Sequence, residues 1–303
     1  MANAFRSNGK LLLTGEYVVL DGALSLAVPT KYGQSLLIEP NNTTKLKWTS
    51  LDKDGDVWFE TSLNIKDIDL LSTESGNDIN KRLIQIIKAA KELNPNFLIS
   101  SNGFEVTTVL DFSRDWGLGT SSTLINNIAQ WAEVNPYHLL KKTFGGSGYD
   151  IACAQYNTAI SYQLQNKTPV INQVEFNPTF KEHLYFVHLN KKQNSREGIT
   201  YYHNHKAHSK SAIRDINTIT KNMIESLSFE DFEHLINQHE HIISKITKQT
   251  SVNDLLFNDF NGSTKSLGAW GGDFILATSK ENPSAYFTKK GYKTIVPYID
   301  MVL

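Results

Sequence analysis

Residues 117–123 read Gly-Leu-Gly-Thr-Ser-Ser-Thr, and this stretch decides how we interpret the chain. The apolar residues that follow recur at steps of three and four, which predicts a helix that begins near Ser122. A glycine-rich turn that enters a helix suits an anion, because the first backbone N–H groups lack partners and the helix dipole adds positive charge there. The stretch is neither a Walker A motif nor a Rossmann fingerprint. Taken alone, the stretch could also do no more than shape the turn, since many strand-to-helix turns carry glycine and serine for that reason.

Three further segments accompany this turn. They are Gly9-Lys10-Leu11-Leu12-Leu13-Thr14-Gly15-Glu16-Tyr17-Val18-Val19-Leu20, Gly145-Gly146-Ser147-Gly148-Tyr149-Asp150 and Leu267-Gly268-Ala269-Trp270-Gly271-Gly272-Asp273. In order and spacing the four segments resemble the motifs of the GHMP kinases, which phosphorylate galactose, homoserine, mevalonate and phosphomevalonate. The first segment is similar to the mevalonate and phosphomevalonate kinase branch. The Gly-Tyr-Asp-Ile-Ala run at 148–152 is also similar to the subgroup known by that signature.

The composition is that of an ordinary globular protein. The chain has 303 residues, of which 40% are hydrophobic and 20% charged, and its formal net charge is -1. This charge argues against a nucleic-acid or membrane partner that is bound along the whole chain. We find no signal peptide and no apolar run near the ~20 residues of a membrane span. With Cys153 as its single cysteine, the chain is expected in the cytoplasm.

Strand and helix signals alternate along the chain. We expect strands over 11–20, 35–39, 45–49, 57–61, 104–112, 159–164, 184–189, 274–277 and 294–302. Apolar spacing predicts helices over 83–93, 213–227 and 232–246, the last with His239 on its apolar stripe. These elements indicate an α+β chain. The resemblance implies a ribosomal-S5-like N-terminal domain, a ferredoxin-like C-terminal domain and an active site between them. We place the boundary near Asn177-Pro178, with domains at 1–178 and 179–303.

Asp150 and Lys10 are the expected catalytic residues. By position alone Asp150 could be a helix cap and Lys10 a solvated lysine at a strand start. The resemblance assigns them other roles: Asp150 contacts the acceptor hydroxyl and orients it or takes its proton, and Lys10 lies close to that aspartate. A neighbouring ammonium would keep the aspartate ionised and stabilise charge on the transferring group.

The cofactors implied by the resemblance are ATP and Mg²⁺. Phosphoryl transfer requires held phosphates, neutralised charge and an aligned acceptor. The phosphate-binding residues are then Gly117, Leu118, Gly119, Thr120, Ser121, Ser122 and Thr123. Ser121 matches the position whose hydroxyl supports Mg²⁺, with Thr120 and Ser122 as neighbours that could substitute for it. For Ser121 the alternative role is a helix N-cap.

The acceptor is expected on the other side of the site. The residues that we assign to it are Glu16, Ser147, Gly148, Gly268, Ala269, Gly271, Gly272, Lys192 and Arg196. Glu16 could equally make a structural hydrogen bond, and the glycines could serve a tight turn. The basic loop at 191–196 could hold a phosphate or carboxylate of the acceptor, or it could be plain solvated surface.

Two departures from the family pattern limit the choice of substrate. Trp270 stands where the family has glycine, and it could narrow the acceptor pocket or offer a stacking face. No carboxylate lies at 137–144, where mevalonate kinases have a metal-binding glutamate, and the phosphomevalonate branch also lacks it. We therefore expect a small-molecule kinase most like mevalonate or phosphomevalonate kinase. A sugar or amino-acid kinase, an ATP-dependent decarboxylase and a non-catalytic nucleotide-binding relative remain alternatives.

Overall fold

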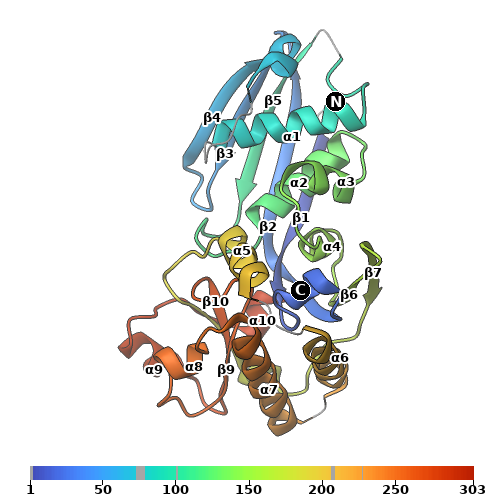
Figure 1. Ribbon diagram of the computed structural model, residues 1–303. Helices are drawn as coiled ribbons and strands as arrows, with labels where there is room; N and C mark the ends of the chain where they lie inside the picture. Colours follow the sequence, from blue (N-terminus) through green and yellow to red (C-terminus); the bar gives the residue numbers. More distant parts are fainter. Residues whose placement is uncertain (1–2, 73–78, 100–101, 206–208, 227) are drawn as a thin grey trace. The chain divides into compact units, whose positions relative to one another are not determined.

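The computed structural model describes residues 3–72, 79–99, 102–205, 209–226 and 228–303 (Figure 1). The chain forms two compact units. Unit 1 consists of Met1–Gly9, Tyr32–Arg114 and Gly119–Gln155, and unit 2 of Lys10–Lys31, Asp115–Leu118 and Tyr156–Leu303. Within the described ranges, no helix is both long and apolar enough to cross a membrane.

Strands of a mixed sheet run through both units. Over the described residues they pair in the order β4-β3-β5-β2-β6-β7, and β1 also pairs with β2. The long strand β2, Ser25–Asn41, belongs to unit 2 up to Lys31 and to unit 1 from Tyr32. The strand β1, Asn3–Leu12, changes from unit 1 to unit 2 after Gly9.

Unit 1 packs helices on its part of this sheet. Its further elements are β3 (Lys45–Leu51), β4 (Val57–Asn64), β5 (Gly103–Leu110), α1 (Ile79–Leu93), α2 (Thr120–Trp131), α3 (Pro136–Thr143) and α4 (Tyr149–Gln155). The strand β3 pairs in parallel with β5 and antiparallel with β4. The helix α1 crosses the sheet in Figure 1 and buries Leu83, Ile86, Ile87 and Ala90 in one core with the sheet residue Trp48. Its apolar stripe therefore forms the core that the helical spacing predicts.

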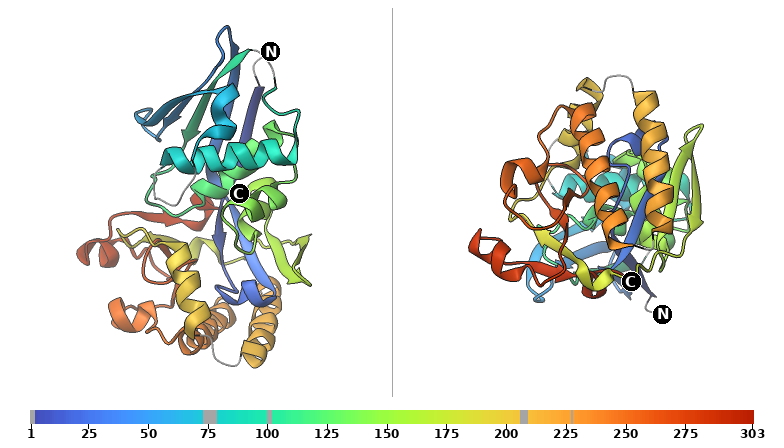
Figure 2. Two further views of the ribbon diagram at one scale, coloured as in Figure 1. Left: turned by 45° about the horizontal axis from the view of Figure 1, so that its top comes forward. Right: turned by 90° about the horizontal axis from the view of Figure 1, so that it is seen from below.

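Unit 2 contains a second sheet and most of the C-terminal helices. Its strands are β6 (Ile160–Gln165), β7 (Thr168–Gln173), β8 (Leu184–His188), β9 (Thr264–Ser266), β10 (Phe274–Thr278) and β11 (Ile295–Pro297). Its helices are α5 (Ser195–His205), α6 (Ser209–Glu225), α7 (Phe229–Thr247), α8 (Val252–Leu256), α9 (Ser284–Lys289) and α10 (Tyr298–Met301). The second sheet has the antiparallel order β11-β8-β10-β9. The helices α6 and α7 pack side by side, as the second view of Figure 2 shows.

The predicted α+β class is confirmed, and so are most of the predicted elements. The helix α2 begins at Thr120, two residues before the predicted start. The helices α6 and α7 carry the predicted stripes, except that residue 227 lies outside the described residues. Six of the described elements have no counterpart among the predictions: the helices α3, α5, α8 and α9 and the strands β7 and β9. The predicted domain boundary near Asn177 stays a prediction.

Two strand predictions were wrong. The segment 11–20 leaves β1 after Leu12 and turns, because Gly15 and Tyr17 both adopt positive φ, and Val18–Asp21 forms a 3₁₀ helix. Its apolar residues are buried in this turn rather than in a strand. At 294–302, the strand β11 covers only Ile295–Pro297, and α10 follows it. A short buried apolar run has no periodicity that separates a strand from a turn or a helix.

Candidate functional site

In unit 2, Lys10 reaches the start of the glycine-rich turn. Its Nζ donates a 2.9 Å hydrogen bond to the carbonyl oxygen of Gly117, and its backbone N–H donates to Leu118 at 3.0 Å. The side chain of Lys10 is thereby held where the predicted phosphate-binding residues begin. A cation at this point can balance the charge of a bound phosphate group.

Asp273 packs against the same glycine. Gly117 has a φ of 64°, and a Cβ at this position would overlap the carboxyl group of Asp273. Any other residue would therefore be strained in its backbone and would displace Asp273. Burial raises the pKa of Asp273, although the Gln193 N–H and the charges of Lys10 and Lys192 act in the opposite direction.

The loop with the predicted basic residues lies beside Asp273. The backbone N–H of Gln193 donates to Oδ1 of Asp273 at 3.0 Å, and the N–H of Asp273 donates to the carbonyl of Lys191 at 2.7 Å. Gly272 permits this approach, since a Cβ there would lie 2.6 Å from the carbonyl oxygen of Lys191. Lys192 is exposed, and the side chain of Arg196 lies outside the described residues. The structure thus brings the 191–193 loop together with the segment Leu267–Asp273.

Trp270, the departure from the family pattern, is buried. Only 4% of it is exposed, and its indole Nε1 has no hydrogen-bond partner within the described residues. Its backbone N–H donates to the hydroxyl of Tyr17 at 3.0 Å. Ala269 and Gly272 are also buried, Gly268 is half-buried and Gly271 is exposed. In this geometry the tryptophan ring fills space inside unit 2 rather than offering an open stacking face.

Glu16 is fully enclosed in unit 2. Its carboxylate forms an ion pair with Lys265, and neither side chain has any exposed surface. Burial raises the pKa of Glu16, but the charge of Lys265 acts in the opposite direction, and the pKa is lowered overall. Of the two roles considered for Glu16, its surroundings are those of the structural one. His239 is buried, as its position on an apolar stripe predicts.

In unit 1, the rest of the glycine-rich turn leads into α2. Gly119 has a φ of 98° and precedes the first helical residue, Thr120. The hydroxyls of Ser122 and Thr123 donate to the carbonyl of Gly119 at 2.8 and 3.1 Å. Ser121 is exposed, and its hydroxyl makes no hydrogen bond within the described part of the chain. Ser121 therefore presents an available oxygen at this helix start, whereas the hydroxyl of Ser122 is engaged with the turn.

Asp150 lies in the first turn of α4, in the same unit. It is half-buried, and it follows Ser147, also half-buried, and the buried Gly148. The helices α4 and α2 pack against each other, and Nε2 of Gln155 donates to Oδ1 of Asn126 at 3.1 Å. The helix with the predicted catalytic aspartate is thus fixed to the helix that follows the glycine-rich turn.

The sequence reasoning missed three residues of unit 2. Asp273, Gln193 and Lys265 had no assigned role. Asp273 ends a motif that was recognised, so a carboxylate directly after Gly-Gly was a usable signal. Lys265 gave no local signal, because the sequence predicted no strand over the residues of β9. Nothing local in the sequence distinguished Gln193.

The comparisons with known proteins bear on the fold. A scan of the sequence against protein-family models finds no match, and a search of curated proteins finds none either. Among solved structures, mevalonate kinase from Methanococcus jannaschii has a TM-score of 0.71 at 16% identity, over 96% of this chain and 95% of that one. Streptococcus pneumoniae phosphomevalonate kinase, in complex with phosphomevalonate and AMPPNP, has a TM-score of 0.72 at 16% identity, over 96% and 97%.

A sugar kinase shares the same architecture. Lactococcus lactis galactokinase, in complex with galactose, has a TM-score of 0.65 at 13% identity, over 95% of this chain and 88% of that one. At such identities the likeness is one of fold. The chain has the two-domain α+β fold of the GHMP kinases, which confirms the resemblance at that level.

Proposed function

We propose that this protein is an ATP-dependent small-molecule kinase that transfers the γ-phosphoryl group to a hydroxyl or phosphate acceptor. The observation that carries the proposal is the contact of the Lys10 ammonium with the carbonyl of Gly117, at the start of the glycine-rich turn that enters α2. The fold shared with several kinases supports it.

ATP and Mg²⁺ are the cofactors that this reaction needs. The backbone N–H groups of Gly119–Ser122 would hold phosphate oxygens, and the exposed hydroxyl of Ser121 fits a metal-bound phosphate better than the engaged hydroxyl of Ser122. When bound, the ion neutralises charge on the phosphates. Asp150 would orient the acceptor hydroxyl and take its proton, and Lys10 would stabilise negative charge on the transferring group.

For the acceptor we propose mevalonate or phosphomevalonate, or a compound of similar size and charge. The absence of a carboxylate at 137–144 favours the phosphomevalonate branch. Exposed Lys191 and Lys192, beside Gly272 and Asp273, suit an acceptor that carries a phosphate or carboxylate. Because the fold is shared with galactokinase, sugars also belong among the acceptors to be tested. The single cysteine, Cys153, fits a reducing compartment, and we propose the cytoplasm as the location.

Turnover of ATP with Mg²⁺ against a mixed acceptor panel tests the proposal. The panel holds mevalonate, phosphomevalonate, homoserine and common sugars, and product masses identify the acceptor that gains a phosphoryl group. A product whose mass shows the loss of carbon dioxide from the acceptor identifies a decarboxylase instead. Nucleotide binding without any product would favour a non-catalytic relative.

The variant Asp150→Asn is measured alongside. We expect its turnover to fall at least ~100-fold, because the acceptor proton loses its base. Its unfolding transition should match that of the unmodified protein, since the substitution keeps the shape of the side chain. Near-normal turnover in this variant would remove Asp150 from the catalytic assignment.

A further inference from the structure

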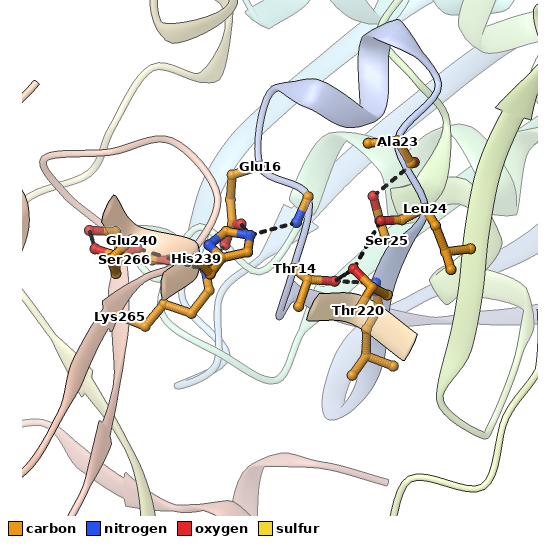
Figure 3. Close-up of polar contacts among 12 residues, drawn as sticks. Thr14, Glu16, Ala23, Leu24, Ser25, Thr220, His239, Glu240, Lys265 and Ser266 are labelled. Carbon is orange, nitrogen blue, oxygen red and sulfur yellow. Dashed lines mark hydrogen bonds and ion pairs between the residues drawn. The ribbon is translucent and has the colours of Figure 1, made fainter. Parts of the chain in front are cut away.

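A cluster of ionisable side chains is buried in unit 2 (Figure 3). Glu16 and Lys265 form its ion pair, and His239, Glu240 and Ser266 surround them. Nζ of Lys265 also donates to the carbonyl of Ser266 at 2.8 Å. All four ionisable residues are less than a tenth exposed. Two charges have thus been removed from water at a place where apolar side chains could have been packed.

The hydrogen bonding of this cluster is incomplete within the described residues. Nε2 of His239 lies 3.1 Å from Oε2 of Glu16, but it accepts the N–H of Gly15 at 2.9 Å and cannot also donate to the carboxylate. Oε2 of Glu16 therefore has no hydrogen-bond donor within the described residues. A buried ion pair of this kind is commonly no more stable than an apolar pair of similar volume. The buried ion pair therefore points to a role in holding two chain segments in place.

The ion pair joins the two chain segments that carry the site in unit 2. Glu16 follows β1, the strand that carries Lys10, and Lys265 lies in β9, directly before the loop Leu267–Asp273. The hydrogen bond from the Trp270 N–H to the Tyr17 hydroxyl joins the same two segments a second time. Burial raises the pKa of Tyr17, so its hydroxyl keeps its proton.

The C-terminal end of the loop Leu267–Asp273 is also connected to Lys10, through Gly117. Asp273 packs on Gly117, and the carbonyl of Gly117 accepts the hydrogen bond from Lys10. The loop is therefore held at three points. Lys265, directly before it, pairs with Glu16, the N–H of Trp270 donates to Tyr17, and Asp273 packs on Gly117. A displacement at the Lys265 end would shift the loop relative to the Lys10 ammonium.

We propose that Glu16, Lys265 and the Tyr17–Trp270 hydrogen bond form a clasp that positions the loop Leu267–Asp273 relative to Lys10. Glu16 and Lys265 are positioning residues in this arrangement. The inference rests on the proposed kinase function only for its effect on turnover, because the clasp itself has a readout that does not depend on activity.

The experiment compares the double variant Glu16→Gln/Lys265→Met with the unmodified protein. Removing both charges avoids an unpaired buried charge, so the double variant should retain the fold. The matched control is Lys47→Met/Glu105→Gln, which removes an exposed lysine–glutamate pair of unit 1. The measurements are kcat and KM with whichever acceptor the panel identifies, and hydrogen exchange of the peptide that covers residues 266–273.

A clasp predicts a specific pattern in the double variant. Its kcat falls about 10- to 100-fold, because small displacements near reacting groups are costly. Exchange at 266–273 is at least about 10-fold faster, because the loop opens locally. The control changes neither quantity. Unmodified exchange and kcat in a folded double variant would overturn the proposal. If the unmodified protein shows no turnover at all, the proposed function fails, and the exchange measurement still decides the clasp.

Discussion

Two lysine–glutamate pairs of this chain have the same chemistry and opposite surroundings. Lys47 and Glu105 face each other across β3 and β5 in unit 1, with 2.9 Å between Nζ and Oε1 and half of each side chain exposed. Lys265 and Glu16 in unit 2 have no exposed side-chain surface. Water screens the first pair and is excluded from the second. The burial of a pair, more than its geometry, therefore sets how much stability the protein loses when one partner is removed.

The largest expected effect is that of breaking the buried pair on one side. In Lys265→Met the carboxylate of Glu16 stays buried without its cation, so the free energy of unfolding should fall by about 3–5 kcal/mol. Denaturant unfolding measures this change. Lys47→Met, the matched control in the exposed pair, should change it by less than about 1 kcal/mol. Similar losses in the two variants would contradict the comparison.

The next effect depends on pH. Glu240 lies beside the buried pair, with Oε1 3.9 Å from Nζ of Lys265, and burial raises the pKa of its carboxyl group to about 8. Between its ordinary pKa of 4.5 and about 8, the folded chain keeps a proton that the unfolded chain has released. The free energy of unfolding therefore decreases as the pH rises through this range, and the decrease stops above about pH 8.

Glu240→Gln removes this titration. Between pH 6 and 8 the free energy of unfolding of the variant should fall less steeply than that of the unmodified protein, by about 1 kcal/mol per pH unit. Urea unfolding at pH 6, 7 and 8 gives the two slopes. Glu105→Gln, the same substitution in the exposed pair, is measured as the matched control. Equal slopes in Glu240→Gln and the unmodified protein would mean that Glu240 is not held neutral by burial.

The smallest expected effect is the coupling within the exposed pair. A double-mutant cycle on Lys47 and Glu105 should give an interaction free energy of about 0.2–1 kcal/mol, decreasing with added salt. The cycle uses Lys47→Met, Glu105→Gln and the double variant. A coupling of several kcal/mol that does not depend on salt would show that exposure is a poor guide to the strength of these pairs.

Local patterns were sufficient for much of the fold. Apolar residues at helical spacing predicted α1, α6 and α7, since a helix buries one stripe whatever its partner. The glycine-rich turn before α2 and the aspartate at the start of α4 were also recognised from residues that are adjacent in the chain. For the segment 11–20 the local pattern gave a wrong prediction, because its apolar residues fit a buried turn as well as a strand.

The candidate site divides in the same way. The chemistry and spacing of neighbouring residues predicted the α+β class, which the structure confirms. They also singled out the glycine-rich turn, Lys10 and Asp150, whose roles stay predictions. Three contacts became known only from the folded chain. They are the hydrogen bond from Lys10 to the carbonyl of Gly117, the packing of Asp273 on the same glycine and the ion pair of Lys265 with Glu16. Glu16 and Lys265 are 249 positions apart, and a contact at such a separation follows from the packing of the whole unit rather than from any local pattern.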